Sequence, residues 1–194
     1  MKKHIYKSII LGLLITIGSC TDLTEEPVGL LAPEAFFKTV KDVETGIFGA
    51  YGLAASENYY GRKLSLSLLL RGDMADIGDR RTPARRQQVN DFDMDSNNGM
   101  VTAFWPRSYQ IIAAANAALE GADNIAEEEN VVNSLKAEAR FIRSFAYYNL
   151  VRLFGEVPLL DALVNDIEAA QTMSKSSVTE IYSLIKEDLA FGKQ

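Results

Sequence analysis

Cys20 carries the most distinctive chemistry in this sequence, because a thiol can be acylated and the chain has no second cysteine to pair with it. Three lysines occupy the first seven residues, residues 9–17 are almost wholly apolar, and Gly18 and Ser19 precede the thiol. This order predicts a secretory signal peptide over residues 1–19, of the lipoprotein type. Cys20 would then begin the mature chain and carry the acyl chains that hold it to a membrane.

Two other interpretations of this segment are weaker. A membrane-spanning helix needs about 20 consecutive apolar residues, and this run has roughly half of them. A cysteine buried in a core is the second alternative, but the order basic, apolar, small, cysteine favours lipidation. Residues 20–32 begin with a polar and acidic segment, which predicts a flexible tether.

The remaining reactive side chains exclude several kinds of chemistry. His4 is the only histidine and lies in the predicted leader, so the mature chain would lack Ser–His and Cys–His nucleophilic pairs and Cys/His metal sites. Without residues 1–19 the chain has 17 basic and 26 acidic side chains, a net charge of −9. That charge argues against nucleic acid as a partner. Carboxylate chemistry, oxygen-ligated calcium or simple binding remain, and we expect no cofactor.

Candidate ligand contacts gather in the irregular, polar stretch 57–100, because long loops inside a domain are often functional. Aspartates occur at steps of three at 73, 76 and 79, and at steps of two at 91, 93 and 95, which leaves open a calcium site or a solvated acidic loop. Aromatic rings suit stacking on sugars, and amides and guanidinium groups suit hydrogen bonds to hydroxyls. The candidates are Tyr59, Tyr60 and Phe92 for stacking, and Arg81, Asn97 and Asn98 for hydrogen bonding.

Apolar residues at steps of four and three predict the helices that must position these groups. We expect helices over 33–56, 101–121 and 130–154, and a last helix from Val178 with Ser177 as its N-cap. Gly121 is expected to end the second helix, and Gly155 to cap the third. Residues 64–70 could form a strand or a helix. Gly46, Gly49 and Gly52 weaken the first helix, which close approach of another helix would explain.

The predicted fold is therefore all-α, built from helical hairpins with one long irregular insertion. The hairpin 101–121/130–154 is similar in shape to a tetratricopeptide unit, and a solenoid needs about three such units for stability. This chain supplies about one and a half of them, so we expect it to be the front part of a longer, apparently truncated protein.

Three segments resemble the SusD/RagB family. The stretch Ala137–Leu159, with sequence AEARFIRSFAYYNLVRLFGEVPL, resembles the hallmark helix of that family. Residues 33–51, with the pair Phe36-Phe37, and the spacing Trp105, Tyr109, Ile112, Asn116 agree with it as well. By this resemblance residues 33–194 form the N-terminal part of a SusD-like helical domain with a tetratricopeptide-like scaffold.

The resemblance also implies a function. Family members are lipoproteins on the outside of the outer membrane. They bind oligosaccharides or other nutrients and deliver them to a SusC-like, TonB-dependent transporter, without cleaving them. A helical-repeat adaptor that docks on a membrane partner without a small ligand is the alternative, and a carboxylate hydrolase is a third. Trp105 is expected in the core rather than as a sugar platform, and Arg140, Arg143 and Arg152 are candidates to pair with Glu138 or Glu156.

Overall fold

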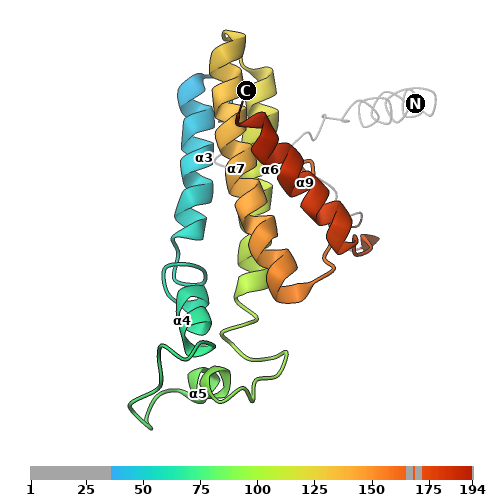
Figure 1. The fold of residues 1–194 in the computed structure, drawn as a ribbon. Helices are drawn as coiled ribbons and strands as arrows, with labels where there is room; N and C mark the ends of the chain where they lie inside the picture. Colours follow the sequence, from blue (N-terminus) through green and yellow to red (C-terminus); the bar gives the residue numbers. More distant parts are fainter. Residues whose placement is uncertain (1–35, 165–167, 169–171, 194) are drawn as a thin grey trace, which may run out of the picture. The chain divides into compact units, whose positions relative to one another are not determined.

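The computed structural model describes residues 36–164, 168 and 172–193. In these ranges it bounds six helices: α3 (Val40–Ala54), α4 (Lys63–Leu70), α5 (Ala84–Asn90), α6 (Phe104–Asn124), α7 (Glu129–Phe154) and α9 (Val178–Phe191) (Figure 1). The same ranges contain no strand, and one isolated antiparallel bridge joins Val157 to Ser176. The all-α prediction is confirmed, whereas the predicted leader, Cys20 and the tether lie outside the described residues.

Helix α7 is the centre of the helical assembly, because it packs against α6, α9 and α3. Figure 1 shows α6 and α7 running in opposite directions as a hairpin, with α3 beside them and α9 crossing α7 at an angle. This is the expected hairpin scaffold. No helix in the described part of the chain is both long enough and apolar enough to cross a membrane.

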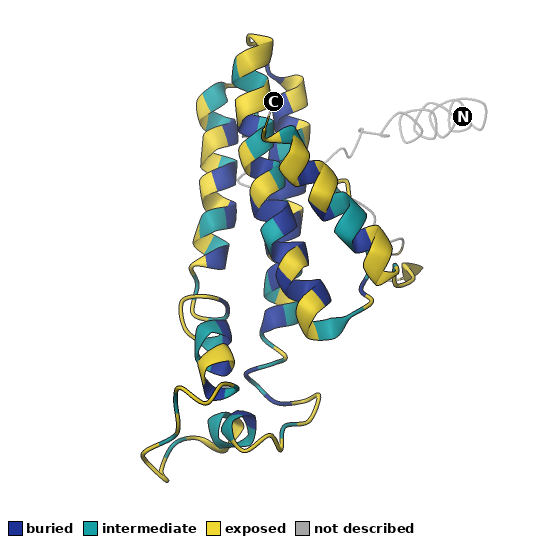
Figure 2. Ribbon diagram, in the orientation of Figure 1, coloured by how far each residue is buried: buried dark blue, intermediate teal, exposed yellow. Residues whose placement is uncertain are grey.

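The core follows the four-and-three spacing of apolar residues. One cluster joins α6, α7 and α9 through fully buried side chains such as Ile112, Leu150 and Ile181. A second cluster joins α3, α6 and α7 through Ile47, Ala118 and Ala139. Figure 2 shows the buried residues as stripes on the facing sides of these helices. Such stripes are the apolar faces of amphipathic helices.

Helix ends depend on local hydrogen bonds that the apolar spacing does not record. Helix α3 begins at Val40, where Thr39 and Asp42 form a capping box, so the predicted helix 33–56 is interrupted at residues 37–39; residues 33–35 lie outside the described residues. The hydrogen bond from the Thr39 side chain, together with nearby backbone N–H groups, lowers the pKa of the Asp42 carboxyl. Ser177 caps α9 as predicted, in a capping box with Glu180. Gly155 ends α7 as predicted, at a φ of 72°.

Gly121 does not end a helix, which corrects the prediction. It lies inside α6, where an added Cβ would be 2.3 Å from Cγ of Phe37. A Cβ on Gly46 of α3 would be 2.8 Å from Cε1 of the same ring. The two glycines therefore form a slot for Phe37 between α3 and α6. At Gly49 and Gly52 an added Cβ meets nothing within 4 Å, so close approach explains only the first of the three α3 glycines.

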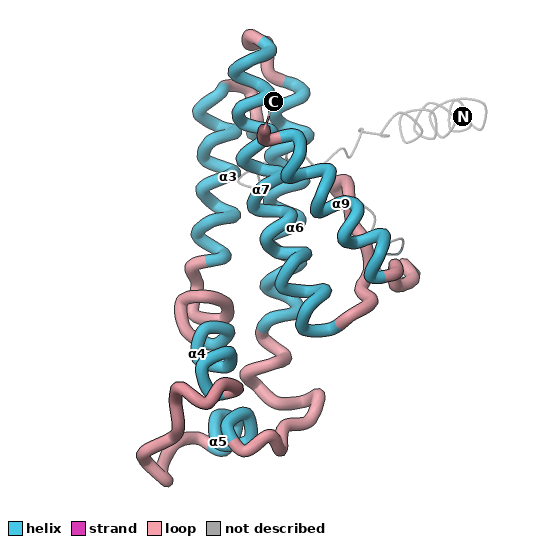
Figure 3. The backbone as a smooth tube through the Cα atoms, viewed as in Figure 1, coloured by secondary structure: helices cyan, strands magenta, loops and turns pink. Residues whose placement is uncertain are grey.

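Residues 57–100 are more structured than predicted. Residues 64–70 are helical, in α4, and α5 follows after a loop, as the tube in Figure 3 shows. Leu70, Val89 and Met100 form a small buried cluster, separate from the two larger ones. Polar loops connect the helices around this cluster, so the segment consists of loops packed around a small buried core.

Candidate functional site

The structure divides the six predicted ligand contacts into buried and exposed groups. Tyr59 is fully buried in the main core, so its ring has no face to offer a ligand, and this corrects the expectation that it stacks on a sugar. Burial raises the pKa of the Tyr59 phenol to about 12. Asn98 is 4% exposed, and its amide holds the surrounding loop together. It donates to the Arg85 carbonyl at 2.9 Å and accepts from the Met100 N–H at 2.8 Å.

Tyr60 lies at the edge of the core with part of its ring exposed. Its hydroxyl donates to Oδ1 of Asn149 on α7 at 2.9 Å, and its ring centroid is 5.2 Å from that of Phe145. The side chain is therefore held in place, with one edge available to solvent.

The other three candidates are exposed on the segment 71–100. Phe92 is 69% exposed and is the one described residue other than glycine with a positive φ, 60°. The guanidinium carbon of Arg71 lies 4.3 Å from the centre of its ring. Arg81 is exposed and pairs with Asp79, and Asn97 is exposed with its N–H donating to Asp95. Phe92, Arg81 and Asn97 therefore share one exposed segment and can all reach solvent.

The aspartates of this segment do not gather into a metal site. Within the described residues, no group of three or more Asp, Glu, His or Cys side chains is placed to hold an ion. Asp76 and Asp95 accept backbone N–H groups of Ile77 and Asn97. These backbone bonds are local, and Asp76 also accepts from the Asn90 amide at 2.9 Å.

Trp105 packs as predicted. It is half-buried against the main core, and its ring contacts those of Tyr109 and Phe154 at centroid distances of 5.3 and 5.2 Å. The partner of Arg143 differs from the prediction. Arg143 on α7 is 4% exposed and forms two hydrogen bonds with Asp188 on α9, which is 1% exposed. Neither Glu138 nor Glu156 takes part.

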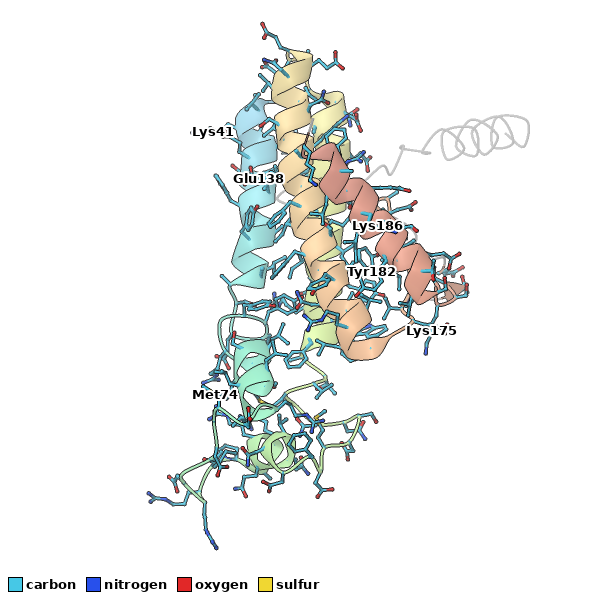
Figure 4. All side chains as sticks on the ribbon, in the orientation of Figure 1. Lys41, Met74, Glu138, Lys175, Tyr182 and Lys186 are labelled. Carbon is cyan, nitrogen blue, oxygen red and sulfur yellow. The ribbon has the colours of Figure 1, made fainter. Side chains whose placement is uncertain are left out.

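Glu138 instead lies on the side of α7 that faces α3 (labelled in Figure 4). Burial raises the pKa of the Tyr51 phenol on α3, and the Glu138 carboxylate raises it further. Arg140 lies over the Phe191 ring, with its guanidinium carbon 4.2 Å from the ring centre, and Arg152 lies over Tyr148 at 4.9 Å. The predicted pairs with Glu138 and Glu156 are thus replaced by pairs of Arg143 and, at 3.8 Å, Arg140 with Asp188, and by the two contacts with aromatic rings.

The loop after α7 is fastened to the core by side chains from the segments that carry the family resemblance. The Tyr109 hydroxyl donates to the Pro158 carbonyl at 2.8 Å, and the Asn116 amide donates to the Leu160 carbonyl at 3.0 Å. The Tyr147 hydroxyl accepts the Leu160 N–H at 2.6 Å, and burial raises the pKa of this phenol to about 12. These side chains form a polar clamp that fixes the loop.

Two pockets were not predicted. A hollow of about 420 Å³ with a mixed polar and apolar lining lies between the start of α7 and the end of α9, with Asn130, Asn133 and Phe191 among its residues. A smaller and mostly apolar pocket lies between α4 and the end of α7. The first pocket follows the acidic residues 127–129, which look like an ordinary solvated surface in the sequence. The second is lined by residues from several helices, so only tertiary packing creates it. Neither pocket could therefore be predicted from a sequence pattern.

Comparison with known proteins supports the family resemblance. Residues 37–194 match a SusD-like family described as starch-binding and associating with outer membrane. SusD-like protein P2 of Formosa agariphila is 50% identical over 194 residues, which are all of this chain and 38% of that protein. SusD-like protein P25 of the same organism is 28% identical over 193 residues and 36% of its length. The chain thus spans a little over a third of the length of these relatives.

Solved structures share the fold. A laminarin-binding SusD-like protein aligns with a TM-score of 0.67 and 22% identity, over 80% of this chain and 34% of the other. A SusD homologue from Bacteroides thetaiotaomicron aligns with a TM-score of 0.71 and 22% identity, over 89% of this chain and 32% of the other. At this identity the similarity shows the fold alone. With the match over residues 37–194 and a relative that is 50% identical, the chain belongs to the SusD-like family of starch-binding proteins associated with the outer membrane.

Proposed function

We propose that this chain is part of a surface lipoprotein that is anchored through Cys20, binds a glycan and delivers it to a SusC-like transporter. The family match over residues 37–194 is the observation that carries the proposal. The leader sequence supports the anchor, and the helical hairpins offer a rigid scaffold. The glycan class is supported by the family description and by the laminarin-binding relative of the same fold.

The anchor is tested by replacing Cys20 with alanine in the full chain, in a bacterial host with an outer membrane. We expect radiolabelled palmitate to enter the unaltered protein and not the Cys20→Ala variant, because the thiol is the acylated atom. The variant should leave the membrane fraction, because it would lack the acyl chains that hold the unaltered protein there. Thr21→Ala, next to the thiol, should behave like the unaltered protein. Palmitate in the Cys20→Ala variant would contradict the anchor.

Phe92 is the proposed stacking platform for the glycan, with Tyr60, Arg81 and Asn97 as further candidate contacts. One face of the Phe92 ring is covered by Arg71, which leaves the other face for a sugar ring. The first probes are soluble starch and laminarin. We expect Phe92→Ala to weaken binding about 5- to 30-fold, the equivalent of about 1–2 kcal/mol for one aromatic contact.

Met74→Ala is the matched control for Phe92, because Met74 is 89% exposed on the same segment (labelled in Figure 4). Retardation in gels that contain each polysaccharide would report the affinity, and Met74→Ala should not change it. Equal retardation of Phe92→Ala and the unaltered chain would show that the ring is not a contact. If neither polysaccharide binds and a large β-barrel protein co-purifies, the adaptor function is favoured instead.

A further inference from the structure

Helix α4 and its C-cap place two apolar and two polar residues on the face that lines the small pocket between α4 and the end of α7. Leu64, Ser67, Leu68 and Arg71 occur at i, i+3, i+4 and i+7, so they share one side of the helix. All four line the pocket, whose volume is about 100 Å³. The other walls are apolar and come from α5, residues 94–104 and the end of α7: Val89, Met94, Val101, Phe104, Leu153 and Phe154.

Two polar atoms in this wall have no hydrogen-bond partner. Ser67 is 7% exposed, and its Oγ is buried and unpaired. Nη1 of Arg71 is also buried and unpaired, and no described carboxylate forms an ion pair with this guanidinium. Leaving a buried donor unsatisfied costs about 1–3 kcal/mol, and more when the group is charged. Both atoms therefore favour an acceptor that enters from outside.

The Arg71 guanidinium is held in position by a strained residue. Phe92 has a φ of 60°, a conformation that is rare for a bulky side chain and costs about 1–3 kcal/mol. Its ring lies against the guanidinium, 4.3 Å from the guanidinium carbon. Strain of this kind is found preferentially at binding sites, because the surrounding structure must enforce it. The ring contact thus holds the guanidinium beside the pocket wall.

We propose that this pocket binds a small carboxylic acid with a short apolar tail. The carboxylate would accept from Nη1 of Arg71 and Oγ of Ser67, and the tail would lie against the apolar walls. A sugar fits poorly, because these walls would leave its hydroxyls unpaired. Leu68 and Leu153 are 47% and 39% exposed, so the pocket is open to solvent at their side chains. This site goes beyond the proposed glycan function and does not depend on it.

Valerate and its neutral amide, valeramide, test the proposal on the full chain. We expect valerate to bind at least tenfold more tightly than valeramide in calorimetry, because the amide cannot neutralise the guanidinium. With ¹³C-labelled methionine methyl groups, the Met94 signal should move on addition of valerate. The signal of the 89% exposed Met74 should stay in place.

Three variants separate recognition from general effects on the fold. Arg71→Gln should weaken valerate binding at least tenfold and bring it close to that of valeramide. Ser67→Ala, which changes little volume, should weaken it a few-fold. Arg80→Gln is the matched control, because this arginine is exposed on the same segment and does not line the pocket. Equal affinity for acid and amide, an unchanged affinity of Arg71→Gln, or a shift of Met74 without Met94 would each overturn the proposal.

Discussion

Replacing Arg143 with methionine is expected to lower the free energy of unfolding by about 3–5 kcal/mol, the usual cost of removing one partner from a buried ion pair. Asp188 would then be left 1% exposed without its main counter-charge. Nε and Nη2 of Arg143 now donate to its two oxygens at 2.8 and 2.7 Å. Arg140 is more distant, at 3.8 Å, and cannot supply these bonds.

The loss would extend beyond α9, because Nη1 of Arg143 serves two further acceptors. It donates to Oδ1 of Asn116 on α6 at 2.8 Å and to the Asp161 carbonyl at 2.6 Å. One guanidinium therefore joins α6, α7, α9 and the loop after α7. Without it, the Asn116 and Asp161 oxygens lose a charged donor, which adds to the cost.

Urea unfolding followed by circular dichroism at 222 nm measures the effect. Arg152→Met is the matched control, because Arg152 is exposed on the same helix, and it should change stability by less than about 1 kcal/mol. The double variant Arg143→Met/Asp188→Leu should recover much of the loss, since no buried charge remains unpaired. Equal midpoints for Arg143→Met and Arg152→Met would contradict the structural role given to the buried pair.

Helix positions were predictable from the sequence because amphipathic spacing records which face is buried. The hairpin of α6 and α7 appears in the sequence as four-and-three steps through Ile112 and Ile142, and both residues are buried. The partner of Arg143 could not be predicted in this way, because it lies 45 residues further on, in another helix. The sequence pointed to nearby glutamates at helical spacing as partners of Arg143. The packing of α9 against α7 brings Asp188 to this guanidinium instead.

The candidate site was less predictable than the fold. Tyr59, Phe92, Asn97 and Asn98 are all polar or aromatic residues in one irregular segment, and the sequence does not distinguish their environments. Tyr59 is taken into the core, and the Asn98 amide bonds to the loop around it. Phe92 and Asn97 stay exposed. Tertiary packing makes this division: Tyr59 joins the main core, while Leu70, Val89 and Met100, which are too far apart in the sequence to form a periodic pattern, form a separate small cluster.

The polar clamp on the loop after α7 gives a structural role to polar residues of the segments that carry the family resemblance. Tyr109, Asn116, Arg143 and Tyr147 come from two helices, and each bonds to backbone of the same loop. Backbone groups in a loop have no helical partners, so side chains must satisfy those that are buried. The polar residues that bond to this loop are therefore largely structural.

Gly121→Ala is expected to destabilise the protein by about 1–3 kcal/mol, the range for overpacking a well-packed site. The new methyl group would be 2.3 Å from Cγ and 2.7 Å from Cβ of Phe37. These atoms are at the base of the side chain, so a simple rotation of the ring cannot clear them. Segment 37–39 would have to move away from α6, and the ring would lose its contacts with the second core cluster.

Gly49→Ala is the matched control, because it introduces the same methyl group in a helix where nothing lies within 4 Å. It should stabilise the protein by about 0.5–1 kcal/mol, since alanine is the better helix former. A double-mutant cycle with Phe37→Ala tests the cause directly. When the ring is absent, Gly121→Ala should no longer destabilise and should follow the sign of Gly49→Ala. If Gly121→Ala costs the same with and without the ring, the slot for Phe37 does not explain why glycine is needed inside α6.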